Sequence, residues 1–238
     1  GRASPDPAMT SPLPTPPPAP LPQRTVVRVH EPGGYDRLSL ETEAMTLPGP
    51  GEVRVRTAAV GVNYADCAVR WGVYKSAREL VGWPIVPGFE FAGEVEAVGS
   101  ATTPRQVGDR VFGVRLFGSY ASHVNVPAHQ TFSLPEGWST PEAAAFPVAF
   151  LTAYYALFQC VRIRPGATIL VHSAAGGVGT ALLQLARIQG FRVVGVVGGP
   201  HKVETARRFG ADEVIDRSSE DLWAAARRHA PGGYDAIL

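Results

Sequence analysis

The first half of the chain alternates short apolar and β-branched runs with turn residues. Such runs lie at 25–30, 52–60, 91–98, 110–114 and 120–126, with glycine or proline between them. Short runs separated by turn signals are typical of strands in small sandwiches and barrels. We therefore predict a β-rich, partly barrel-like domain over residues 24–149.

The pattern changes in the second half, where apolar strands alternate with helical segments. The expected strands lie at 167–172, 192–197, 213–216 and 234–238, the last only begun. Alternation of strand and helix indicates parallel βαβ units. The predicted fold class is α/β, in which the β-rich domain precedes a doubly wound parallel sheet over residues 150–238.

Both ends of the sequence suggest a piece of a longer protein. Residues 1–23 hold a cluster of prolines, which remove backbone donors and restrict φ, so we predict a disordered leader there. The chain stops at Leu238 inside an apolar run. A doubly wound dinucleotide fold normally has about six strands. We therefore expect the second domain to be truncated, and the fragment to be poorly soluble or inactive by itself.

Composition and charge exclude several classes of function. The 22 basic residues nearly balance the 21 acidic ones, which argues against a dedicated nucleic-acid binder. The two cysteines can form neither a disulfide framework nor a four-thiolate zinc site. The longest apolar run, 169–186, is interrupted by His172, several glycines and Gln184, so no membrane span is predicted. We predict a soluble protein of a reducing compartment, the cytoplasm.

A glycine-rich turn between a strand and a helix is a candidate phosphate-binding loop. Ala174-x-Gly176-x-x-Gly179 has the spacing of the dinucleotide fingerprint, with alanine in the first position. Small residues let the backbone approach a pyrophosphate, whose charge the helix N-terminus stabilises. Alternatively, the glycines only permit tight packing. Because strand, turn, helix and second strand occur in order, we favour cofactor binding by the turn residues Ala175, Gly176, Gly177 and Val178.

The end of the second strand indicates which dinucleotide binds. Proteins that bind NAD usually carry Asp or Glu about twenty residues after the turn, where it binds the ribose 2′-hydroxyl. Here Val196 occupies that position, Lys202 follows at the start of the next helix, and Arg217 lies just past the third strand. Although both cations could simply be solvated charges, the lack of an acidic residue and the presence of these basic ones favour a cofactor with a 2′-phosphate. We predict that NADP(H) binds, with Gly198, Lys202 and Arg217 in its site.

Several further motifs occur in order along the chain. They are Gly61-Val62-Asn63-Tyr64-Ala65-Asp66, Trp71-Gly72-Val73-Tyr74, Pro87-Gly88-Phe89-Glu90-Phe91-Ala92-Gly93, Gly108-Asp109-Arg110-Val111 and Leu151-Thr152-Ala153-Tyr154-Tyr155. With the glycine-rich turn, they resemble the medium-chain dehydrogenase/reductases, in the zinc-free quinone oxidoreductase (zeta-crystallin-like) branch that includes the vesicle amine transport protein relatives. The resemblance implies a GroES-like domain, a Rossmann domain with the cofactor in the cleft between them, and a homodimer for the full-length form.

The resemblance also implies roles for single residues. Zinc-dependent members carry cysteine where Asn63 stands and histidine where Phe89 stands, so no metal is predicted. Asn63 is expected beside the nicotinamide and Tyr74 beside the acceptor, where a phenol can hydrogen-bond to a developing negative charge. Thr152, expected at the start of the helix that links the domains, matches a residue near the cofactor in relatives. Alternatively, Thr152 is only a hydroxyl residue at the start of a helix, and this explains its presence equally well.

The implied reaction is hydride transfer from NADPH to a quinone or an α,β-unsaturated carbonyl. Close relatives often carry a second tyrosine where Ala68 stands, so the identity of the acceptor stays open. One alternative is the enoyl-reductase domain of a polyketide-type synthase, which residues 147–155 also resemble, although such domains usually carry arginine where Ala65 stands. Another alternative is an NADPH-binding interaction protein with little turnover.

Overall fold

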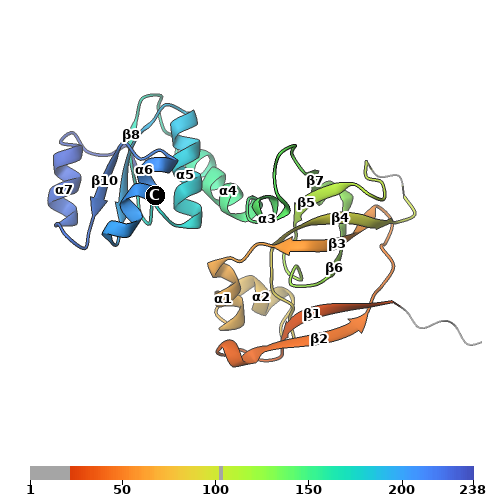
Figure 1. Ribbon diagram of the computed structural model, residues 1–238. Coiled ribbons are helices and arrows are strands. Elements are labelled where there is room, and N and C mark those ends of the chain that lie inside the picture. Colours follow the sequence, from red (N-terminus) through yellow and green to blue (C-terminus); the bar gives the residue numbers. More distant parts are fainter. Residues whose placement is uncertain (1–21, 102–103) are drawn as a thin grey trace, which may run out of the picture.

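The structure is a computed structural model that describes residues 22–101 and 104–238. It has a β-rich part and an α/β part, joined through helices α3 (Thr140–Ala144) and α4 (Pro147–Tyr154) (Figure 1). The predicted leader lies outside the described residues except for Pro22 and Gln23, and Gln23 already opens the first strand. The predicted domain boundary after residue 149 falls inside α4.

An antiparallel five-stranded sheet, in the order β6-β3-β4-β5-β7, forms the centre of the first part. Side chains of a strand point alternately to its two faces. One face here is apolar, so Val53, Val55, Phe91 and Val95 are fully buried and form a common core. The strands are β3 (Glu52–Val60), β4 (Glu90–Val98), β5 (Arg110–Val114), β6 (His123–Pro127) and β7 (Thr131–Ser133).

A hairpin of two strands lies against this sheet, and its buried Val26 pairs with Ala121 in an isolated bridge. The second strand of the hairpin was not predicted, because four of its seven residues are polar and none of the seven is buried. Cross-strand ion pairs of Glu43 with Arg24 and Arg28 hold it instead. The elements are β1 (Gln23–Val29), β2 (Leu38–Ala44) and the 3₁₀ turn η1 (Tyr35–Arg37) between them.

Two short helices, α1 (Tyr64–Arg70) and α2 (Lys75–Leu80), connect β3 to β4. They were not predicted, since neither is long enough to show a helical period in its apolar positions. Asn63 is the N-cap of α1 and Tyr74 is the N-cap of α2. Both residues predicted to act in catalysis therefore stand at the beginning of a short helix.

The second part contains the predicted parallel sheet, in the order β10-β9-β8-β11. The apolar run 234–238 predicted a last strand, which is present over Ala236–Ile237 and pairs with the first strand of this part. The elements are β8 (Thr168–Val171), α5 (Gly177–Ile188), β9 (Arg192–Val197), the 3₁₀ turn η4 (Pro200–Lys202), α6 (Val203–Phe209), β10 (Glu213–Asp216), α7 (Leu222–His229) and β11 (Ala236–Ile237). A further 3₁₀ turn, η2 (Ala128–Gln130), lies in the first part, between β6 and β7.

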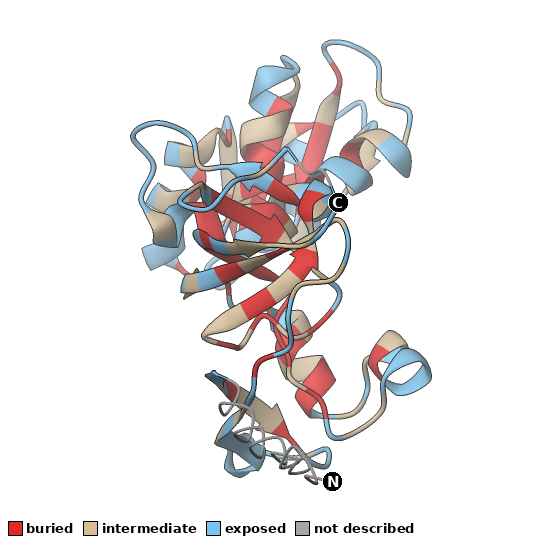
Figure 2. Ribbon diagram, turned by 90° about the vertical axis from the view of Figure 1, so that its right-hand side faces the viewer, coloured by how far each residue is buried: buried red, intermediate tan, exposed pale blue. Residues whose placement is uncertain are grey.

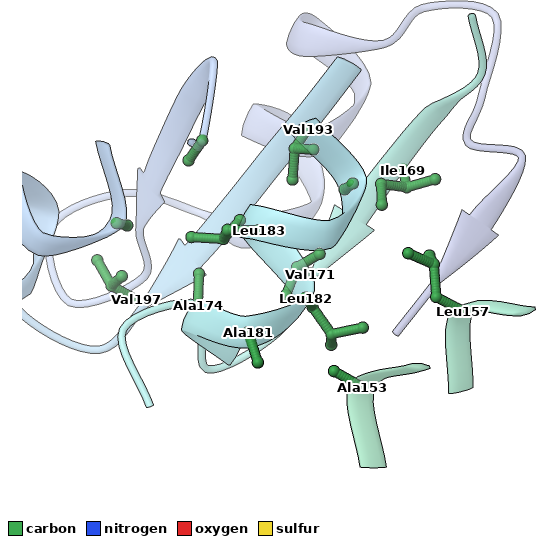
Figure 3. Packing of buried hydrophobic residues seen from close by; sticks show 13 residues of the cluster. Ala153, Leu157, Ile169, Val171, Ala174, Ala181, Leu182, Leu183, Val193 and Val197 are labelled. Carbon is green, nitrogen blue, oxygen red and sulfur yellow. The ribbon is translucent and has the colours of Figure 1, made fainter. Parts of the chain in front are cut away.

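Helix α5 packs between the sheet and α4 (Figure 3). Leu183 and Val193 belong to this core on the sheet side, and Leu182 lies close to Ala153 of α4. A π-helical turn, η3 (Tyr155–Gln159), continues α4 and buries Leu157 in the same core. Buried residues are concentrated along the strands of both parts (Figure 2). Helix α4 is thus anchored in the α/β part by its second half.

Candidate functional site

The glycine-rich turn joins β8 to α5. Ser173 adopts a φ of 49°, and the N–H of Gly176 donates to the carbonyl oxygen of Ser173 at 2.7 Å, which closes the turn. A positive φ is uncommon for a residue with a side chain, so the turn is strained at this point. Gly176 is the N-cap of α5 and has no side chain to accept the first helical N–H groups. These N–H groups and the helix dipole suit the binding of a phosphate.

Two glycines allow the turn to pack tightly. A Cβ atom on Gly179 would lie 2.2 Å from the carbonyl oxygen of Ser173, and one on Gly195 of β9 would lie 2.9 Å from the Cβ of Ala174. Gly195 therefore makes room for the alanine that replaces the first glycine of the fingerprint. Gly177 differs from both, because a Cβ there would meet no atom within 4 Å. Its surroundings are open, as the approach of a ligand requires.

A cavity of about 490 Å³ lies at the carboxyl ends of β8 and β9, where open α/β sheets bind their ligands. Five of the residues predicted to bind the cofactor line it, namely Ala175, Gly176, Gly198, Lys202 and Arg217. The other lining residues are His172, Ser173, Val196, Val197 and Leu222. Lys202 and Arg217 supply positive charge, whereas none of these lining residues is a carboxylate. The cavity therefore suits an anionic ligand with several phosphates.

The structure does not bring every predicted residue to this cavity. Gly177 and Val178 lie in the first turn of α5, whereas Asn63 and Tyr74 lie in the β-rich part. Thr152 is exposed and lies past the middle of α4, so its predicted place at the start of that helix is wrong. The helix begins instead at Pro147, since proline is favoured in the first helical position.

Asn63 is held by two buried carboxyl groups. Its Nδ2 donates to Oε1 of Glu90 at 2.7 Å, and its backbone N–H donates to Oδ2 of Asp66 at 2.8 Å. Asp66 also accepts from the N–H of Gly88 at 3.1 Å and from the hydroxyl of Tyr120 at 3.0 Å. Glu90 is 1% exposed and Asp66 5% exposed. Each buried carboxyl is compensated by hydrogen-bond donors, as such groups must be.

Burial shifts the titration of this cluster. Desolvation raises the pKa of Glu90 above 4.5, and the nearby Asp66 adds to the rise, while hydrogen bonds from Val148 and Asn63 oppose it. Desolvation likewise raises the pKa of Asp66, against the hydrogen bonds that it accepts. Burial next to Asp66 raises the pKa of the Tyr120 phenol, so Tyr120 remains a hydrogen-bond donor.

We expect the contribution of Glu90 to stability to decrease as the pH rises. Its pKa in the folded state lies above the unfolded value, so this contribution is fully present below about pH 4.5 and is lost as the pH rises through the folded pKa. Urea unfolding of the wild type and of Glu90→Gln checks this from about pH 4 to about pH 8. The free energy of unfolding of the wild type should fall relative to that of the variant. A pH-independent difference would contradict the expectation.

Tyr74 lies in an aromatic cluster of the β-rich part. Its ring centroid is 5.6 Å from that of Phe89 and 6.1 Å from that of Phe117. Both phenylalanines are 8% exposed and belong to the core, whereas Trp71 is exposed and packs edge-on against Tyr64. The phenylalanines therefore serve packing, and they fix the ring of Tyr74 at the beginning of α2.

The two positions at which zinc-dependent relatives carry ligands hold other groups here. The amide of Asn63 is bonded to Glu90, and the ring of Phe89 is buried among aromatic side chains. Neither side chain is a zinc ligand. Within residues 22–101 and 104–238, no three or more His, Cys, Asp or Glu side chains are grouped so that they could hold a metal ion.

Sequence reasoning missed Glu90 and Asp66 as members of the candidate site, although both stand in the quoted motifs. The signal was available in Phe89-Glu90-Phe91-Ala92, because a glutamate inside an apolar run must find buried donors. It also missed Ser173, whose positive φ no residue pattern reveals.

The comparisons with known proteins cover both parts of the chain. Residues 49–136 match the family of the alcohol dehydrogenase GroES-like domain, and residues 177–238 match the zinc-binding dehydrogenase family. The structure of a human synaptic vesicle membrane protein VAT-1 homolog-like protein is 34% identical, with a TM-score of 0.83, over 91% of this chain and 67% of that one. This chain is a medium-chain dehydrogenase/reductase.

Within this family, the chain belongs to the branch that contains the quinone oxidoreductases and VAT-1. An Escherichia coli quinone oxidoreductase, whose structure holds NADPH, is 33% identical with a TM-score of 0.80, over 87% of this chain and 63% of that one. The synaptic vesicle membrane protein VAT-1 homolog of Rattus norvegicus is 39% identical over 209 residues, which are 87% of this chain and 51% of that protein. The chain thus spans about half the length of this curated relative.

A second group of relatives consists of synthases that are much longer than this chain. The phthioceranic/hydroxyphthioceranic acid synthase of Mycobacterium bovis is 35% identical over 230 residues, which are 92% of this dehydrogenase/reductase and 11% of the synthase. The same fold therefore occurs both in separate oxidoreductases and inside a large synthase. Among the described residues, no helix is long and apolar enough to cross a membrane.

Proposed function

We propose that this dehydrogenase/reductase transfers a hydride from NADPH to a quinone or an α,β-unsaturated carbonyl without a metal. One observation carries the cofactor assignment, namely that Lys202 and Arg217 line the same cavity as the glycine-rich turn while no carboxylate does. The solved E. coli relative with NADPH supports the same cofactor. The two cysteines, Cys67 and Cys160, are free, which agrees with a reducing compartment such as the cytoplasm.

The chain's own residues divide the work between binding and chemistry. The N–H groups at the start of α5 hold the pyrophosphate, and Lys202 and Arg217 bind the 2′-phosphate. When bound, the nicotinamide supplies the hydride. Asn63 orients the nicotinamide, and the Tyr74 hydroxyl donates a hydrogen bond to the acceptor oxygen on which negative charge develops. The proton that completes the product comes from Tyr74 or from water.

A cofactor titration of the complete gene product that contains residues 1–238 tests the proposal. Binding of NADPH and of NADH is followed by fluorescence, and a quinone or a simple enone is then added while oxidation of the cofactor is recorded. We expect tighter binding of NADPH and turnover with at least one acceptor. Preference for NADH would contradict the roles of Lys202 and Arg217. Binding without turnover would favour the interaction protein instead.

Replacing Tyr74 by phenylalanine is expected to lower kcat without weakening NADPH binding. The variant keeps the ring contacts with Phe89 and Phe117 but loses the hydroxyl that stabilises the developing charge. Loss of one such donor costs about a hundredfold in kcat. Steady-state kinetics with saturating NADPH measures the change, and Tyr64→Phe, on an exposed side chain, serves as the matched control. An unchanged kcat in Tyr74→Phe would assign the proton and the charge stabilisation to another group.

The second candidate function is that of an enoyl-reductase domain inside a synthase. The alignment of nearly the whole chain with a small share of the Mycobacterium bovis synthase favours it. An enone attached to an acyl carrier protein discriminates the two functions from the same assay. Much faster reduction of the carrier-bound enone than of free quinones would support the synthase domain.

The homodimer implied by the resemblance stays a prediction.

A further inference from the structure

The carboxyl group of Glu90 lies between a predicted catalytic residue and the helix that joins the two parts. Its Oε1 accepts from Nδ2 of Asn63 at 2.7 Å, and its Oε2 accepts from the N–H of Val148 at 2.7 Å. Val148 stands in the first turn of α4, whose N-cap, Phe146, has no side-chain acceptor. Glu90 thus supplies from another element the acceptor that the start of α4 lacks.

The space around Glu90 is filled, so the carboxylate has little freedom to move. It is 1% exposed, and a Cβ atom on Gly61 would lie 2.0 Å from its Oε1. Gly61 therefore provides the room in which the carboxylate reaches Asn63. The charged and titratable groups near it are Asp66 and, beyond Asp66, Tyr120.

This arrangement permits only one orientation of the Asn63 amide. Turning the amide by half a turn would place its oxygen against Oε1 of Glu90, where two acceptors repel each other. An ionised carboxylate accepts hydrogen bonds and donates none. Consequently the NH₂ group faces Glu90, and the amide oxygen faces the N3 backbone of α1, with which Asn63 forms a capping box.

We propose that Glu90 is a positioning residue, which fixes the orientation of the Asn63 amide toward the nicotinamide and ties it to the first turn of α4. The role of Asn63 in this inference rests on the proposed function. The hydrogen bond between Asn63 and Glu90 is independent of it. Because α4 packs on α5 behind the glycine-rich turn, Glu90 connects the amide physically to the part that binds the phosphates. The orientation of Asn63 is therefore coupled to the placement of the linking helix.

The variant Glu90→Gln tests the inference because it exchanges one acceptor oxygen for a donor at equal size. The backbone N–H of Val148 cannot turn, so the glutamine oxygen stays with it and the new NH₂ group faces Asn63. The amide of Asn63 must then turn over to present its oxygen. We expect kcat to fall about tenfold while the Kd of NADPH changes less than about threefold, since the phosphates still bind.

A double-mutant cycle separates positioning from general stability. If Glu90 acts through Asn63, Asn63→Ala and the double variant Asn63→Ala/Glu90→Gln should have the same kcat. Multiplying losses would overturn the proposal, because they would show that Glu90 acts independently of Asn63. Glu94→Gln is the matched control, since Glu94 lies on the same strand, is exposed and pairs with Arg56 at 3.5 Å.

An NMR measurement needs neither cofactor nor turnover. The side-chain amide protons of Asn63, assigned by their loss in Asn63→Asp, should include one strongly downfield resonance in the wild type, since it donates to a carboxylate. That resonance should move upfield as the pH is lowered and Glu90 is protonated. Because the measurement uses the wild type, it remains valid even if Glu90→Gln does not fold. A resonance at an ordinary, pH-independent position would refute the hydrogen bond. A downfield resonance together with absent NADPH turnover would refute only the proposed function.

Discussion

Replacing Gly179 by alanine is expected to unfold or greatly weaken the α/β part and to abolish NADPH binding. The added Cβ would lie 2.2 Å from the carbonyl oxygen of Ser173 and 2.9 Å from the backbone of Ala174. Backbone atoms cannot rotate away as a side chain can, so α5 must shift from the turn. Overpacking of this kind costs about 3 kcal/mol. Urea unfolding measures the loss, and a fluorescence titration with NADPH measures the affinity.

Gly177→Ala is the matched folding control for this experiment. It makes the same chemical change in the same turn, but its Cβ would meet no atom within 4 Å, so the free energy of unfolding should be unchanged or slightly raised. Equal stability of the two variants would show that the close approach of α5 to Ser173 is not required by the fold.

Replacing Lys202 and Arg217 together by alanine is expected to remove the preference for NADPH over NADH. The two cations line the cavity beside Gly198, and the guanidinium of Arg217 is close enough that a Cβ on Gly198 would lie 3.5 Å from its Nη2. Each charge-assisted hydrogen bond to a phosphate is worth about 1.5 kcal/mol or more. Losing both should weaken NADPH binding about a hundredfold and leave NADH binding nearly unchanged.

Paired titrations of the variant with NADPH and NADH measure this change. Arg207→Ala removes an exposed arginine from α6 that does not line the cavity, and it should affect neither cofactor. If both cofactors lost affinity equally in the double variant, the cations would act on the pyrophosphate that the two cofactors share. The assignment of the 2′-phosphate to Lys202 and Arg217 would then be wrong.

The predictions for Gly179 and for the pair Lys202 and Arg217 depend on features that the sequence revealed to different degrees. The strand at 192–197 and its lack of an acidic residue were plain in the sequence, and so was Lys202 at the start of the next helix. The strain at Ser173 and the contact behind Gly179 were not, because they depend on dihedral angles and distances that a residue pattern does not encode.

The sequence by itself determined the order of elements in the α/β part, the place of the glycine-rich turn and the family, because these follow from local periodicity and from motifs at fixed spacing. Only the tertiary structure decided how α1, α2 and β2 form, since short or polar elements are held by contacts with residues distant in the sequence. It also decided the partnership of Asn63, Glu90 and Val148, which are distant in sequence. Folding brings them together because a buried carboxylate must meet donors wherever the packed chain supplies them.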